Sequence, residues 1–62
     1  MKLRLREMRK RKGLSIRGLA AKANVGFANI HRIETGKVTP DLATLEKLAK
    51  ALGVPVTELL GK

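Results

Sequence analysis

Apolar residues recur at helical intervals in five separate stretches of this chain. Residues 2–12 predict a first helix, in which Leu5 and Met8 form an apolar edge that Met1 extends by one turn. A second helix is expected over 16–23. Its apolar positions follow the spacing of one helix face and are Ile16, Leu19, Ala20 and Ala23. The chain shows no strand-like alternation, so the pattern predicts an all-α fold.

Three further helices follow in the second half of the chain. The third is expected over about 26–35, with Ile30 and Ile33 facing the core. The fourth is expected over 42–52, where a single apolar stripe contains Leu42, Leu45, Leu48, Ala49 and Leu52. A short fifth helix should begin near Pro55 and be completed by Leu59 and Leu60.

Residues that favour helix ends separate these stretches. Ser15 and Asp41 are expected N-caps of the second and fourth helices. Asn24 tolerates left-handed backbone and can form a sharp corner between the second and third helices, with Val25 filling the gap behind it. Glycines that favour helix C-termini are Gly13, Gly36 and Gly53.

Length and composition set the scale of the fold. The chain has 62 residues, no cysteine and one aromatic residue, so we expect one domain spanning 1–62 with an aliphatic core. A domain of this size buries only about 60% of its unfolded surface. No apolar run approaches the roughly 18 residues of a membrane span, and a signal-peptide pattern is absent. We therefore expect a soluble cytoplasmic protein.

The net charge of +9 is unevenly distributed. Residues 1–40 hold eleven Lys or Arg against Glu7 and Glu34, whereas residues 41–62 hold three basic and three acidic residues. A one-sided positive field favours a polyanionic partner such as nucleic acid. The alternative is that the excess charge only keeps a small domain in solution.

Burial of Ile30 and Ile33 determines which side of the third helix faces outward. Residues four apart share a helix face, so the outward positions are Phe27, Ala28, His31 and Arg32. A small residue, Ala20, lets the second and third helices approach closely. Two short helices joined by a sharp turn in a basic domain are typical of a helix-turn-helix.

The stretch 14–36 and the LATLEKLAKALGV stretch at 42–54 closely resemble the Cro-type, lambda-repressor-like helix-turn-helix family of phage and bacterial regulators. The resemblance extends from about residue 4 to 60. The matching motif positions are Ala20, Asn24, Val25, Ile30 and Ile33. It implies a compact five-helix domain whose third helix enters the DNA major groove.

The resemblance also implies roles for individual residues. The base-facing positions would be Phe27, Ala28, His31 and Arg32. The phosphate-contacting positions would be Ile16, Arg17, Gly26, Asn29, Thr35 and Lys37. Arg9 and Glu34 match a pair that ties the first helix to the end of the third in some members of the family.

This chain departs from the family at several of these positions. Many members have Gln where Ile16 can offer only its backbone N–H, and Gly26 stands where Ser or Thr is usual. Phe27 and Ala28 replace polar residues; they can touch thymine methyl groups, whereas only Arg32 can fork onto guanine. Direct base contacts are therefore expected to be weak unless Arg32, His31 and Asn29 make them, and binding should depend strongly on salt.

Other interpretations of these residues remain open at this point. Phe27 could be a core residue, while His31, Arg32 and the basic run 9–12 could be ordinary solvated positions. Leu3 does not fit the inward edge of the first helix, so it is either exposed or covers a partner. Val56, Leu59 and Leu60 could close the core or form the seam of a two-fold dimer, which the resemblance favours, with half-sites about one DNA turn apart. Such a chain could be monomeric until it binds DNA.

The leading hypothesis is a sequence-specific double-stranded DNA-binding transcriptional regulator, with repression the favoured mode. The alternatives are an antitoxin-like or coactivator-like protein-interaction module, a non-specific nucleic-acid binder, or a designed or idealised domain without an evolved target. The sequence lacks a nucleophile–base pair, a glycine-rich phosphate loop and a carboxylate cluster, so we do not expect an enzyme. One His without Cys predicts no metal site, and no cofactor or small-molecule ligand is evident.

Overall fold

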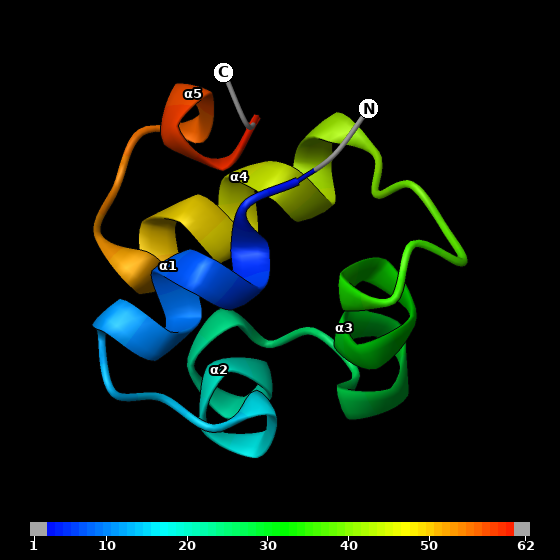
Figure 1. Cartoon of the computed structure of the whole chain (residues 1–62), viewed down its shortest axis with the longest axis horizontal. Helices are drawn as coiled ribbons and strands as arrows, with labels where there is room; N and C mark the ends of the chain where they lie inside the picture. Colours follow the sequence, from blue (N-terminus) through cyan, green and yellow to red (C-terminus); the bar gives the residue numbers. More distant parts are fainter. Residues whose placement is uncertain (1–2, 61–62) are drawn as a thin grey trace.

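Five helices build the chain in the computed structural model, which describes residues 3–60 (Figure 1). They are α1 (Leu5–Arg11), α2 (Ile16–Ala23), α3 (Phe27–Glu34), α4 (Leu42–Leu52) and α5 (Val56–Leu59). No residue between 3 and 60 lies in a strand, which confirms the all-α prediction. None of the helices in this range is long and apolar enough to cross a membrane.

The first helix is shorter than its apolar pattern predicted. It begins at Leu5, and the predicted contribution of Met1 lies outside the described residues. The backbone N–H of Arg4 donates to the carbonyl of Leu59 at 2.9 Å, which ties the start of the chain to α5. Arg4 has φ −97° and ψ 27°, outside the helical region, so it forms the N-cap, and helical bonding starts from its carbonyl.

The corner between α2 and α3 forms at Asn24, as expected. Asn24 has φ 57° and ψ 44°, which is the left-handed region that Asn tolerates better than most residues. The next backbone N–H, that of Val25, bonds back to the carbonyl of Ala20 at 3.1 Å. The half-buried Val25 packs against the core. This turn directs the chain from the end of α2 into α3.

Local hydrogen bonds mark the other helix ends. The hydroxyl of Ser15 accepts the N–H of Gly18, and the carboxylate of Asp41 accepts the N–H of Thr44, each at 2.9 Å. Gly36 ends α3 with φ 80°, and the N–H of Lys37 bonds to the carbonyl of Arg32 at 2.9 Å. The sequence therefore specified these ends through short-range hydrogen bonds.

The Asp41 cap makes a testable contribution to stability at low pH. Hydrogen bonding from Thr44 lowers the pKa of Asp41 below its ordinary value. A carboxyl whose pKa is lowered by folding stabilises the fold above its unfolded pKa, and that stabilisation is lost as pH falls through the folded pKa. In Asp41→Asn, an uncharged side chain still caps the helix, so the melting temperature should fall less steeply below about pH 4 than in the unchanged protein. Melting curves by circular dichroism across this range test the expectation, and parallel pH profiles for the two proteins would contradict it.

The core receives side chains from all five helices. The buried apolar residues are Leu5, Met8, Leu19, Ala23, Ile30, Ile33, Leu45, Leu48, Ala49, Leu52 and Leu59. Three other predicted core positions, Ile16, Ala20 and Leu60, are half-buried against this cluster.

Leu42 does not belong to the buried stripe of α4, so that prediction was wrong. Its side chain is 64% exposed. Leu42 is the first residue of α4, and a helical side chain leans toward the N-terminus of its helix. It therefore extends past the end of α4 toward the preceding loop, where no described element covers it.

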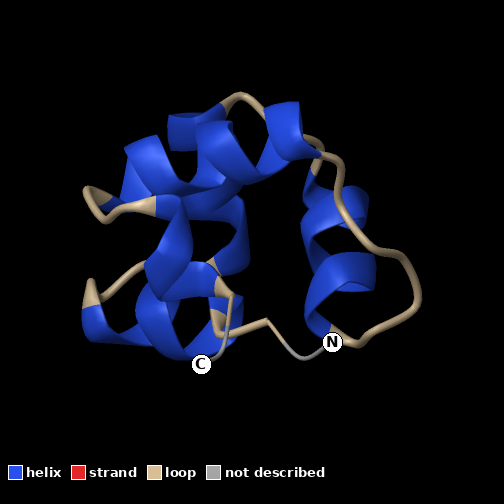
Figure 2. Ribbon diagram, turned by 90° about the horizontal axis from the view of Figure 1, so that it is seen from above, coloured by secondary structure: helices blue, strands red, loops and turns tan. Residues whose placement is uncertain are grey.

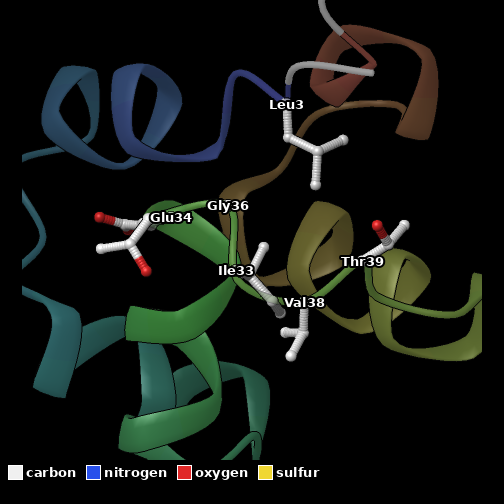
Figure 3. Close-up of a pocket in the computed structure, with 7 residues that line it drawn as sticks. Leu3, Ile33, Glu34, Gly36, Val38 and Thr39 are labelled. Atoms are coloured by element: carbon white, nitrogen blue, oxygen red, sulfur yellow. The ribbon is translucent and has the colours of Figure 1, made fainter.

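Leu3, which the periodicity left without a role, is half-buried against the protein's own core. It lines a hollow together with Ile33, Gly36 and Val38 where the start of the chain passes the end of α3 (Figure 3). Its apolar character is explained by this packing within the chain.

In both views α3 lies at one side of the molecule (Figures 1 and 2). It packs against α2, while α2 also packs against α4, and α4 against α5. One flank of α3 is therefore held by the fold while its other flank faces outward.

Candidate nucleic-acid interface

The outward flank of α3 carries the side chains that the sequence placed there. Ile30 and Ile33 are buried at 0% and 4% exposure, which fixes the orientation of the helix. The exposed residues of α3 are Phe27, Ala28, Asn29, His31 and Arg32. With 44% of its surface exposed, Phe27 is not a core residue.

The N-terminus of α2 offers two backbone donors near this surface. Ser15 accepts the N–H of Gly18, and within the described residues the N–H groups of Ile16 and Arg17 have no hydrogen-bond acceptor. Unpaired amides at a helix N-terminus attract phosphate. The half-buried Ile16 therefore keeps its side chain on the core while its backbone remains a donor.

A shallow hollow lies where α1, α2 and the end of α3 meet. It brings together three predicted DNA-contacting residues, Ile16, His31 and Thr35, beside the Arg9–Glu34 pair. Arg6 also lines it, and sequence reasoning missed this residue. Arg6 precedes Arg9 by one helical turn, so the predicted position of Arg9 could have identified it.

Thr35, Gly26, Asn29 and Lys37 are all exposed. The Thr35 hydroxyl, however, lies 3.0 Å from the carbonyl of His31 and 3.2 Å from that of Arg32, to which it donates. A phosphate oxygen needs a donor, so the hydroxyl of Thr35 would have to rotate away from the helix to bind one. Lys37 follows Gly36 in the loop after α3 and has no such competing bond from its side chain within residues 3–60.

Arg9 and Glu34 form a bidentate ion pair between α1 and the end of α3. Arg9 Nε is 2.7 Å from Glu34 Oε2, and Arg9 Nη2 is 3.0 Å from Glu34 Oε1. The third donor, Nη1, bonds to the carbonyl of Leu14 at 2.9 Å. Hydrogen bonding to Glu34 raises the pKa of Arg9 above its ordinary value despite burial. The pair is almost fully buried, with side-chain exposures of 10% and 5%.

These ion pairs determine which cations remain available to a ligand. Glu7 binds Arg4 and Arg11 at 3.2 and 3.4 Å, and Glu34 binds Arg9. No other acidic residue precedes Asp41. Within residues 3–60, the basic residues of the first forty positions without a carboxylate partner are Arg6, Lys10, Lys12, Arg17, Lys22, Arg32 and Lys37. The four basic residues at positions 9–12 thus differ in role. Arg9 is buried in a structural ion pair, whereas the side chains of the other three are exposed.

Arg17 and Phe27 make a contact that the sequence analysis did not predict. The guanidinium carbon of Arg17 lies 4.9 Å from the centroid of the Phe27 ring. The contact joins the start of α2 to the start of α3, beside the outward flank.

The candidate dimer seam at the C-terminus needs correction. Leu59 is fully buried in the core of its own chain and cannot contact a second copy. Its carbonyl accepts the N–H of Arg4, which fixes α5 against the start of the chain. Only Val56 and Leu60 of the proposed seam remain partly accessible.

The chain matches the helix-turn-helix family over residues 5–59. It is 39% identical over 57 residues to the HTH-type transcriptional regulator DdrOP3 of Deinococcus deserti, covering 92% of this chain and 44% of that protein. It is 42% identical over 59 residues to the HTH-type transcriptional repressor RghR of Bacillus subtilis, covering 94% and 44%. Over 59 residues it is 37% identical to the immunity repressor of Bacillus phage phi105, covering 95% and 41%.

A solved structure shares the fold. The restriction-modification controller protein C.AhdI of Aeromonas hydrophila superimposes with a TM-score of 0.89 at 37% identity, covering 92% of this chain and 86% of that one. The chain therefore belongs to the helix-turn-helix family, and the relatives that it resembles are named as transcriptional regulators and repressors. It spans less than half the length of these curated relatives. DNA-binding transcription regulation is the function that this membership supports.

Proposed function

We propose that this chain binds double-stranded DNA in a sequence-specific manner, with α3 in the major groove, as the DNA-binding unit of a transcriptional repressor. The observation that carries the proposal is the orientation of α3. Two buried isoleucines hold it by one flank, while Arg32, His31 and Phe27 are exposed on the other. A helix presented in this way fits the major groove.

The surrounding groups suit the DNA backbone. The free amides at the start of α2 and the side chain of Lys37 would bind phosphates, with Gly26, Asn29 and Thr35 close to the same strand. Ala28 and Phe27 would contact thymine methyl groups, and Arg32 would fork onto guanine, with His31 beside it. We also propose that the chain binds DNA without catalysing a reaction, and that it is located in the cytoplasm.

The proposal includes a two-fold dimer on DNA. Val56 and Leu60 are the partly accessible residues of the predicted seam, and each copy would bring the same surface to the interface. The two α3 helices would then contact half-sites about one DNA turn apart.

Selection from random duplexes tests this function. A specific regulator should enrich a palindromic sequence and prefer it to random DNA by about 10³-fold or more. A non-specific binder would show the same affinity and salt dependence on every duplex. A protein-interaction module would bind DNA weakly even at low salt, which would also overturn the proposal.

Lys37→Ala should weaken binding to every duplex to the same extent. Removing one phosphate contact should also reduce the slope of log affinity against log salt by about one unit. Fluorescence anisotropy titrations at several salt concentrations measure both quantities. Lys50→Ala removes the same charge at the C-terminal end of α4, across the molecule from the 37–40 loop (Figures 1 and 2). Equal effects of the two substitutions would show that Lys37 acts only through net charge.

A further inference from the structure

The contact between Arg17 and Phe27 is built from the first turns of two helices. Arg17 is the second residue of α2, and Phe27 is the first residue of α3. Their separation of 4.9 Å is within the roughly 6 Å over which a cation is attracted to an aromatic face. The contact therefore holds a long, flexible side chain at the start of the proposed recognition helix.

Arg17 has no other partner that would occupy its donors. Arg4, Arg9 and Arg11 each bind a carboxylate. Among the described residues Arg17 makes no ion pair and no side-chain hydrogen bond. The contact with the ring is made through the charge of the guanidinium and needs none of its N–H groups as hydrogen-bond donors to a protein acceptor. Phe27 thus restricts the conformation of the Arg17 side chain, while every N–H group of the guanidinium remains available to a ligand.

Phe27 is well placed for this role because its ring is not needed by the core. Phe27 is 44% exposed on the outward flank of α3, next to the small Ala28. A side chain whose rotamers are restricted before binding loses less entropy when it meets its ligand. The exposed aromatic ring therefore prepares Arg17 for DNA.

We propose that Phe27 is a positioning residue that holds Arg17 for a guanine edge, so that the pair recognises a thymine and a guanine on adjacent base steps. The inference rests on the proposed DNA-binding function. A planar guanidinium forks onto guanine O6 and N7, and an apolar ring contacts the C5 methyl of thymine. Because the two groups lie 4.9 Å apart and bases are spaced by about 3.4 Å, the two bases must be neighbours in the duplex.

The alternative is that Arg17 contacts a DNA phosphate. A phosphate contact and a guanine contact require different properties of the side chain. A phosphate needs only positive charge near the backbone, which lysine also supplies. A guanine contact needs the planar fork, which lysine lacks. Arg17→Lys therefore separates the two assignments while preserving charge.

The first test compares variants on the duplex obtained by selection, using anisotropy titrations of the whole chain. Phe27→Ala and Arg17→Lys should each reduce the preference at the thymine–guanine step by about fivefold to a hundredfold, and both should leave the salt slope unchanged. Phe27→Tyr, which keeps an aromatic face, should restore the preference. Phe27→Leu supplies apolar bulk without that face and should not restore the guanine preference. Circular dichroism confirms that each variant is folded.

The second test alters the bases. Deoxyuridine in place of thymine removes the methyl group, and 7-deazaguanine removes N7. Each change should weaken binding of the unchanged protein, whereas Phe27→Ala should be insensitive to deoxyuridine and Arg17→Lys to 7-deazaguanine.

Two results would overturn the inference. One is full sequence preference in Arg17→Lys; the other is an unchanged protein that is indifferent to both base analogues. If selection has still yielded a preferred duplex, either result would be consistent with the proposed DNA-binding function and would assign Arg17 to a phosphate contact. If selection yields no preferred duplex, the proposed function and this inference both fail.

Discussion

Glu34→Ala should lower the free energy of unfolding by about 3–5 kcal/mol, because it leaves the charge of Arg9 buried without a partner. Arg9 is only 8% exposed, and two of its three hydrogen-bonding nitrogens bind Glu34. Small domains are stable by only about 5–15 kcal/mol in total. For a domain of this size, the loss should lower the melting temperature by about 12 °C or more. Thermal and urea unfolding followed by circular dichroism measure the effect.

Glu7→Ala is the matched control for this substitution. It removes the same charge, but the ion pairs of Glu7 are exposed and so contribute little to stability. A second control, Arg9→Met combined with Glu34→Leu, removes both charges and should recover much of the loss. At temperatures where Glu34→Ala remains folded, it should still prefer the same duplex. A normal melting temperature for Glu34→Ala would refute the prediction.

Arg32→Ala should reduce the preference for the selected duplex by about fivefold to a hundredfold while leaving affinity for random DNA nearly unchanged. Arg32 is exposed on the outward flank of α3 and has no carboxylate partner within residues 3–60. A bidentate contact with guanine contributes about 1–3 kcal/mol of discrimination against other bases. Anisotropy titrations on the preferred duplex and on a scrambled duplex of equal length measure this difference.

Arg32→Lys provides the control for charge. It retains the positive charge but cannot fork onto O6 and N7, so it should lose the preference as Arg32→Ala does and keep the salt slope of the unchanged protein. Equal losses on the preferred and scrambled duplexes in Arg32→Ala would instead place Arg32 on a phosphate.

These expectations depend on the sequence and the structure to different degrees. The sequence was sufficient to place Ser15, Asp41 and Asn24 at helix ends, because each acts through bonds or backbone angles within a few residues. It was also sufficient to orient α3, because Ile30 and Ile33 lie on one side of a regular helix. The Arg9–Glu34 pair followed from family resemblance, since nothing local links residues 25 positions apart.

The misplaced predictions share a physical cause. The apolar spacing of Leu42 fits the stripe of α4, but no described element covers this first residue of the helix, which is 64% exposed. The first helix starts only at Leu5, where the chain bends so that the N–H of Arg4 bonds to Leu59, and that long-range bond keeps α5 against the core. Periodicity describes a helix by itself and contains no information about where its neighbours end.

By itself, the sequence determined five helices, the capped ends of α2 and α4, the buried side of α3 and the one-sided positive charge, since these follow from local hydrogen bonding, periodicity and composition. Tertiary structure alone decided the contact of Arg17 with Phe27 and the burial of Leu59. Each of these depends on how separate helices pack, which sets the distance between residues that are far apart along the chain.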